Sequence, residues 1–258
     1  MFAKERLEEI AEAVEKEQRV TVKELAEKYQ VTEDSIRKDL TVLEKQGRLQ
    51  KVYGGAVSVR RNPGLYSSSQ RINDHEEERQ ELAEQLFSLL KPGMTVFLDV
   101  SVTNILLAEK IRNSGMELTA VTNMIAVMNV LAEAEHVKLI LLGGRINQER
   151  DAFWSAAAAD AAGRYRYDLA FLGTVGVNAQ TGELSTYQEE DGILKHIVME
   201  RAKQSWVIAE EHKFHEEGDY RYGDLSEVSG LILSRKAQRK YKANQSGQTR
   251  SAGRKRHE

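Results

Sequence analysis

Residues 20–59 read VTVKELAEKYQVTEDSIRKDLTVLEKQGRLQKVYGGAVSV, and this stretch decides the fold of the first part of the chain. Apolar residues recur at helical spacing over 22–29 and again after Thr32, whose hydroxyl can cap a helix. Only Gln30 and Val31 stand in a turn between the two expected helices. This spacing predicts a helix-turn-helix motif.

The second expected helix has an apolar side and a polar side. Ile36, Leu40 and Leu43 fall on the side that packs inward. In helix-turn-helix motifs the outward N-terminal half of this helix enters the major groove of DNA. After Gly47 the apolar residues alternate around a Gly54 turn, which predicts a wing of two short strands.

Basic residues outnumber acidic ones over 28–61, which agrees with a DNA-facing surface. Cations on the wing are placed for phosphates, and polar residues on the second helix for base edges. The alternatives are a small helical adaptor and a winged module that binds protein. The candidate DNA-binding residues are Thr32, Ser35, Arg37, Lys38, Lys51 and Arg60.

Composition limits the class of protein. A chain of 258 residues that is 41% hydrophobic can form one sizeable core and a smaller domain. Cys is absent, which excludes disulfides, and no His spacing suggests a metal site, so we predict neither metal nor cofactor. No apolar run approaches bilayer length and the first helix is amphipathic, so we expect a soluble, cytoplasmic protein without membrane contact.

Residues 60–74 are polar and lack periodicity, which predicts a linker after a DNA-binding domain at 1–59. A helix at 75–90, stopped by Pro92, opens a second domain. Apolar strands at 94–100, 117–122, 137–144, 168–177, 205–209 and 229–234 then alternate with helices. This order predicts an α/β domain at 75–236 with a mostly parallel sheet, followed by a disordered basic tail at 237–258.

Small polar residues follow the expected strands, where parallel sheets bind ligands. Helix-start amides and hydroxyls there can bind an anion, although the same residue types also cap helices and form turns. Lys213 is the favoured phosphate cation, ahead of Arg145 and Lys195, and the alternative for each is a solvated surface residue. The candidate effector residues are Asp99, Ser101, Thr103, Asn104, Thr122, Asn123, Gly143, Gly144, Arg145, Lys195 and Lys213.

The same strand ends offer no convincing acid and base for catalysis. Asp99 is the one suggestive carboxylate, because Glu190 and Asp191 are expected at an exposed helix start. We therefore predict no catalytic residue and no enzyme.

The N-terminal string resembles the winged helix-turn-helix of the DeoR family of bacterial sugar-catabolism regulators, whose signature runs "VSe.TIRRDL..Le..G.l.r.hGGA". Lys38 replaces the usual second Arg, which keeps the charge and loses a bidentate fork, and Tyr53 stands where His is frequent. The matching residues are Glu24, Leu25, Ala26, Val31, Thr32, Ser35, Ile36, Arg37, Lys38, Asp39, Leu40, Leu43, Glu44, Gly47, Gly54, Gly55 and Ala56.

Residues 79–234 resemble the sensor domain of that family, whose fold is similar to ribose-5-phosphate isomerase and which senses a phosphorylated sugar. Ser101 and Val102 replace the family's usual Gly and Thr, Asp191 its Glu, and Glu210 its Asp, so these departures fall in the expected pocket. The matching positions are Gly93, Asp99, Thr103, Thr122, Asn123, Gly143, Gly144, Asp168, Phe171, Gly173, Gly176, Lys195, Lys213 and Phe214.

The resemblance implies a DNA-binding transcriptional regulator, more often a repressor of a sugar-catabolism operon, that a phosphorylated sugar releases from double-stranded operator DNA. It also implies a homo-oligomer, a dimer or a tetramer. One alternative is an isomerase-like sugar-phosphate enzyme fused to a DNA-binding module. Another is a sugar-phosphate-binding adaptor that does not bind DNA.

Overall fold

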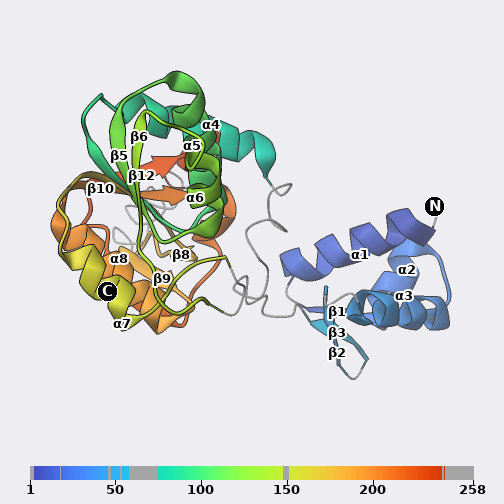
Figure 1. Ribbon diagram of the computed structural model, residues 1–258. Coiled ribbons are helices and arrows are strands. Elements are labelled where there is room, and N and C mark those ends of the chain that lie inside the picture. Colours follow the sequence, from blue (N-terminus) through green and yellow to red (C-terminus); the bar gives the residue numbers. More distant parts are fainter. Residues whose placement is uncertain are drawn as a thin grey trace, which may run out of the picture. The chain divides into compact units, whose positions relative to one another are not determined.

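A computed structural model describes residues 3–17, 19–45, 48–52, 54–57, 75–147, 151–239 and 241. The chain divides into two compact units, Met1–Pro63 and Gly64–Glu258 (Figure 1). The predicted linker at 60–74 lies outside the described residues, so its limits stay a prediction. Residues 235–239 are helical and Ala237 is fully buried, so the tail does not begin at 237 as predicted.

The first unit contains the helix-turn-helix. Its helices are α1 (Ala3–Glu17), α2 (Val22–Tyr29) and α3 (Glu33–Lys45). Strands β1 (Arg19–Thr21), β3 (Gly55–Val57) and β2 (Gln50–Val52) form an antiparallel sheet in that order. The wing was predicted with two strands, but its sheet has a third, β1. This strand is only three residues long, which is too short to give a recognisable sequence pattern.

Local hydrogen bonds explain where these helices begin and end. Thr21 and Glu24 form a reciprocal capping box at the start of α2. Gln30 ends that helix in the left-handed conformation, and the Thr32 hydroxyl accepts from the Ser35 amide at the start of α3. The core of the unit confirms the predicted inward side, because Ile36, Leu40 and Leu43 are at most 1% exposed.

Two adjacent glycines allow the wing to form. Gly54 has φ of +79°, a conformation that favours glycine, in the turn between β2 and β3. At Gly55 a Cβ atom would lie 2.0 Å from the backbone oxygen of Val20, so only glycine lets β3 pair with β1 at this point.

The second unit is built on a parallel six-stranded sheet, as predicted. Its order is β12 (Gly230–Leu233), β10 (Ala202–Ala209), β7 (Tyr167–Gly173), β4 (Thr95–Leu98), β5 (Leu118–Thr122) and β6 (Val137–Leu141). All of its strand pairs are parallel.

Helices cover both faces of this sheet. One core cluster includes Leu82, Ile105 and Val127 from α4 (Glu76–Leu89), α5 (Val102–Ser114) and α6 (Ile125–Leu131). The other includes Ala158 and Leu194 from α7 (Ala156–Gly163) and α8 (Glu189–Arg201). The strands are apolar on both sides because both sides are buried.

A small antiparallel sheet was not predicted. Its order is β11 (Tyr220–Asp224), β9 (Glu183–Thr186) and β8 (Gly176–Val177). A 3-10 helix, η3 (Glu211–Phe214), lies between β10 and β11 in the chain. These elements are short, and β11 contacts α8 beside the large sheet.

The strand order fixes where a ligand can bind. From β4 the chain proceeds outward through β5 and β6, and then returns to β7 on the other side of β4. The switch point therefore lies between β4 and β7, where parallel α/β sheets open a crevice at their carboxyl edge. In the part of the chain that the structure describes, no helix has both the length and the apolar character needed to cross a bilayer.

Candidate functional site

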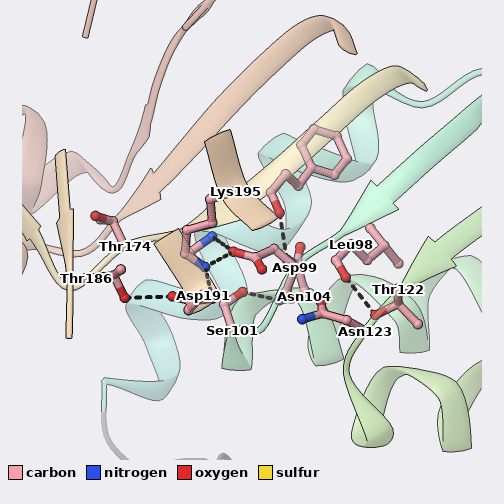
Figure 2. Close-up of polar contacts among 12 residues, drawn as sticks. Leu98, Asp99, Ser101, Asn104, Thr122, Asn123, Thr174, Thr186, Asp191 and Lys195 are labelled. Atoms are coloured by element: carbon pink, nitrogen blue, oxygen red, sulfur yellow. Dashed lines mark hydrogen bonds and ion pairs between the residues drawn. The ribbon is translucent and has the colours of Figure 1, made fainter. Parts of the chain in front are cut away.

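Asp99 stands at the switch point, directly after β4, and is fully buried. Its Oδ2 accepts hydrogen bonds from the Gly173 amide at 2.9 Å and from Lys195 Nζ at 2.5 Å (Figure 2). Gly173 ends β7, and a Cβ atom there would lie 2.8 Å from the Val100 oxygen. The glycine thus lets the two strand ends approach closely enough to place the carboxylate.

Lys195 lies between two carboxylates. Besides Asp99, its Nζ donates to Oδ1 of Asp191 at 2.8 Å, and the Thr186 hydroxyl donates to Asp191 Oδ2 at 2.6 Å. Lys195 is 2% exposed and Asp191 4%. Burial alone would lower the pKa of Lys195, but the charges of Asp191 and Asp99 outweigh it and raise that pKa. Lys195 therefore stays an ammonium ion.

This group of residues corrects two expectations. Asp191 was expected at an exposed helix start, but β9 and β11 cover it, and burial raises the pKa of its carboxyl. The alternative that Lys195 is a solvated surface residue is also wrong, because Lys195 is buried. The four-residue spacing of Asp191 and Lys195 on one helix was the available signal for the pair. Two buried carboxylates thus meet where the sequence offered only Asp99.

Two asparagines extend the site toward β5. Asn104 Nδ2 donates to the backbone oxygens of Asp99 at 2.8 Å and Phe171 at 2.9 Å. Asn123 follows β5 and is fully buried. Oδ1 of each asparagine, and Oδ1 of Asp99, are buried without a hydrogen-bond partner among the described residues.

Other predicted residues at this edge have structural partners. The Ser101 hydroxyl caps α5 by accepting from the Asn104 amide at 3.1 Å. Thr122 joins its strand to β4 by donating to the Leu98 oxygen at 2.7 Å, and it accepts from the Met124 amide. Thr103 is buried in the first turn of α5. Ser101 and Thr122 thus perform the capping and bridging roles that their residue types also allow.

The remaining predicted residues lie nearer the surface. Gly143, Gly144 and Arg145 follow β6 and are exposed, and Arg145 pairs with Glu190 at 2.8 Å. Lys213 lies on η3, past the end of β10, with a side chain that is 11% exposed and 3.5 Å from Glu216. Of the three predicted cations, Lys195, Arg145 and Lys213, the last has the longest ion-pair distance.

The first unit carries a separate candidate interface on α3. Arg37 is exposed and is held by Glu33 at 2.6 Å and Asp34 at 2.9 Å on its own helix. Lys38 is exposed, while the hydroxyls of Thr32 and Ser35 lie 3.0 Å apart at the start of the helix. A shallow depression on this surface is lined by Asp34, Arg37, Lys38, Thr41, Val42 and Lys51.

Lys51 links the wing to the helix. Its Nζ donates to the Thr41 hydroxyl at 2.8 Å and its amide to Glu44 at 2.9 Å. The structure thus brings Lys51 beside Arg37 and Lys38 on one surface, whereas Arg60 lies outside the described residues. Asp39 of the matched motif is buried and bonds Arg6 of α1 at 2.7 Å, so it supports the position of α3.

Comparisons with known proteins agree with these two units. The model of the DeoR-like helix-turn-helix domain matches residues 6–62, and that of the DeoR C terminal sensor domain matches 74–235. The HTH-type transcriptional repressor GlcR of Bacillus subtilis is 29% identical over 91% of this chain and 90% of its own length. The lactose phosphotransferase system repressor of Lactococcus lactis is 27% identical over 83% and 84%.

Solved structures similar to this chain include ribose 5-phosphate isomerase A of Methanocaldococcus jannaschii, with a TM-score of 0.41 and 20% identity over 55% of each chain. The two family matches together cover almost all of the described residues, and each falls on one unit of the structure. This protein therefore belongs to the DeoR family of transcriptional regulators.

Proposed function

We propose that this regulator represses an operon for the use of a sugar and leaves its operator when a phosphorylated sugar binds the carboxyl edge of the large sheet. The observation that supports this proposal is the buried group Asp99, Lys195 and Asp191 at the switch point of the second unit, which we call the sensor unit. Burying ionisable groups is costly, and a cluster of them at the ligand-binding edge of such a sheet supports a binding site. The repressors named above, one of them of a lactose phosphotransferase system, support a sugar as the effector.

The phosphate of the effector contacts Lys213 in this proposal. Lys195 is the poorer candidate, because two carboxylates already accept its hydrogen bonds. Lys213 pairs with Glu216 at 3.5 Å and acts on Glu210 through its charge, without a hydrogen bond to either of these described residues, so its ammonium keeps donors for a phosphate. Arg145, which is exposed and pairs with Glu190, is a second cation at the same edge.

DNA binding uses the exposed side of α3 and the wing. Arg37 and Lys38 contact base edges or nearby phosphates, and Lys51 contacts phosphate. Arg37 must exchange its bonds to Glu33 and Asp34 for bonds to DNA, which favours sequences that offer it two acceptors. A homodimer would place two such helices on two half-sites of the operator. The protein would act in the cytoplasm, where the operator DNA is.

Catalysis is the competing function, because Asp99 and Asp191 are two buried carboxylates in one site. Lys195 bridges them and keeps its proton, so it does not act as a base or as a nucleophilic amine. We propose that the site binds its sugar phosphate without converting it, as its relatives named as repressors suggest.

One experiment tests the function. The protein is titrated onto the DNA upstream of its own gene and of neighbouring genes, with and without ribose 5-phosphate, fructose 1-phosphate, fructose 6-phosphate, glucose 6-phosphate and galactose 6-phosphate. We expect specific binding that one of these weakens at least tenfold, with that compound recovered unchanged. Steady turnover would favour the enzyme, and the absence of specific DNA binding would favour an adaptor.

A further inference from the structure

Three buried acceptors at the carboxyl edge have no donor among the described residues. They are Oδ1 of Asp99, Asn104 and Asn123, three side chains with no exposed surface. About 90% or more of buried polar groups in proteins are paired, so three unpaired acceptors on neighbouring elements are unusual. Asp99 belongs to the connection from β4 to α5, Asn104 to the first turn of α5, and Asn123 follows the adjacent strand β5 (Figure 2).

The fold fixes which atoms remain free. Both hydrogens of Asn104 Nδ2 are used by the carbonyl oxygens of Asp99 and Phe171, so the amide cannot be reversed and Oδ1 must stay an acceptor. Asp99 Oδ2 already accepts two hydrogen bonds, from Gly173 and Lys195. Asp99 Oδ1 is therefore the carboxylate oxygen that is left without a hydrogen bond from the described residues, and it is buried away from solvent.

The free acceptors of the site disfavour a phosphate at this position. Asp99 and Asp191 are two carboxyl groups that share the single ammonium of Lys195. A phosphate is itself an anion with few protons to donate at neutral pH, so unpaired buried acceptors disfavour it. A sugar hydroxyl is neutral and donates a hydrogen bond. The free acceptors therefore match the hydroxylated part of a ligand.

We infer that Asp99, Asn104 and Asn123 form a polyol subsite, which binds adjacent hydroxyls of the effector and directs its phosphate away from Lys195. This rests on the proposed function, because it concerns the same ligand. In this arrangement Lys195 is a positioning residue, since it orients the Asp99 carboxylate and does not contact phosphate. Specificity among sugar phosphates then depends on the hydroxyls that these three acceptors contact.

The structure offers a matched control for the key carboxylate. Asp168 also accepts from one backbone amide, that of Thr95 at 2.9 Å, and from one lysine, Lys203 at 2.7 Å. It lies at the amino edge of the same sheet, near the start of β7. Asp99→Asn and Asp168→Asn therefore change the same kind of group at opposite edges, and only the first lies in the proposed subsite.

The experiment measures binding to the full chain by calorimetry. The probes are the five sugar phosphates named above, 2-deoxyglucose 6-phosphate, 2-deoxyribose 5-phosphate and inorganic phosphate. We expect Asp99→Asn to weaken the tightest sugar phosphate at least tenfold, because an acceptor becomes a donor, and to leave inorganic phosphate unchanged or bound more tightly. Asp168→Asn should bind every probe as the wild type does.

Asn123→Ala provides a second test if Asp99→Asn does not fold. The Asn123 amide donates one long hydrogen bond of 3.4 Å to Phe153, so little of the fold depends on it. We expect it to weaken the same sugar phosphate several-fold. Wild-type affinity in both folded variants would overturn the subsite and leave the proposed function intact. If no sugar phosphate binds the wild type, both the subsite and the effector proposal fail.

Discussion

Arg79 Nε lies 2.8 Å from Oε1 of Glu210, and the two side chains are only 6% and 8% exposed. Arg79 belongs to the first turn of α4, and Glu210 directly follows β10. The Glu211 amide also donates to Glu78 at 2.8 Å, and the rings of His75 and His212 stack at 4.6 Å. The beginning of the sensor unit is thus bonded to η3, the element that carries Lys213.

Arg79→Ala should reduce the free energy of unfolding by about 3–5 kcal/mol, because it removes the hydrogen-bonded cation of the buried Glu210 carboxylate. Urea unfolding of the full chain measures this. The matched control is Arg164→Ala, which removes an exposed pair with Asp160 and should cost at most about 1 kcal/mol. Equal losses in the two variants would show that burial of the Arg79 pair has no special importance.

Acid should destabilise the sensor unit in two steps. Burial and the charge of Lys213 lower the pKa of His212 from 6.5 to about 3, with Glu210, His75 and Arg79 also nearby. Between these pH values His212 is protonated in the unfolded chain but not in the folded chain, so the free energy of unfolding falls as the pH drops from about 6.5 toward 3. Burial opposes ionisation of Glu210, yet Lys213 and Arg79 outweigh it and lower its pKa from 4.5 to about 2, which extends the loss to lower pH.

Denaturant midpoints measured between pH 4.5 and 7 test the first step. His212→Gln should flatten this dependence, because the proton-binding difference disappears with the ring. His215→Gln is the control, since His215 is 52% exposed, and it should keep the wild-type slope. A wild-type slope in His212→Gln would assign the dependence to other groups.

On the DNA-binding surface, Arg37→Ala and Lys51→Ala should have different effects. Loss of a base contact at Arg37 should weaken operator binding by about 1–3 kcal/mol and relax specificity. Lys51→Ala should weaken all sequences alike and reduce the salt slope by about one. Fluorescence anisotropy with operator and scrambled DNA at several salt concentrations separates the two. Wild-type binding by both variants would contradict the proposed docking of α3 and the wing.

The sequence predicted those features that depend on neighbours along the chain. The cap at Thr32, the inward residues of α3 and the apolar strands of the large sheet are local patterns, and the structure confirms them. In a parallel sheet the carboxyl ends of all strands lie at one edge. For this reason Asp99, Asn104 and Asn123, which follow two of these strands, were predicted to lie together.

Other features depend on pairing between distant segments. β1 is three residues long and is a strand only because β3 pairs with it. Asp191 is buried because its partner Thr186 lies on β9 and Tyr222 of β11 packs in the same core as α8. Since β9 and β11 were not predicted, the helix start looked exposed, and the second carboxylate of the site was missed.

The last prediction concerns the phosphate. Lys213→Ala should lower the affinity of the effector at least about tenfold, because a charge-assisted hydrogen bond is worth about 1.5–3 kcal/mol. Binding of operator DNA without effector should be unchanged, so the dose-response curve for release shifts to higher effector concentration. Lys203→Ala, which removes a lysine at the amino edge of the sheet, is the matched control and should respond as the wild type does.

A sugar without phosphate separates this contact from the polyol subsite. It should bind the wild type and Lys213→Ala about equally, because Lys213 acts on the phosphate alone, whereas Asp99→Asn should weaken it further. Release by the sugar phosphate at wild-type concentrations in Lys213→Ala would leave Lys213 as a surface lysine paired with Glu216. The phosphate would then depend on the backbone amides at 101–104 and 143–145, where α5 begins and β6 has ended.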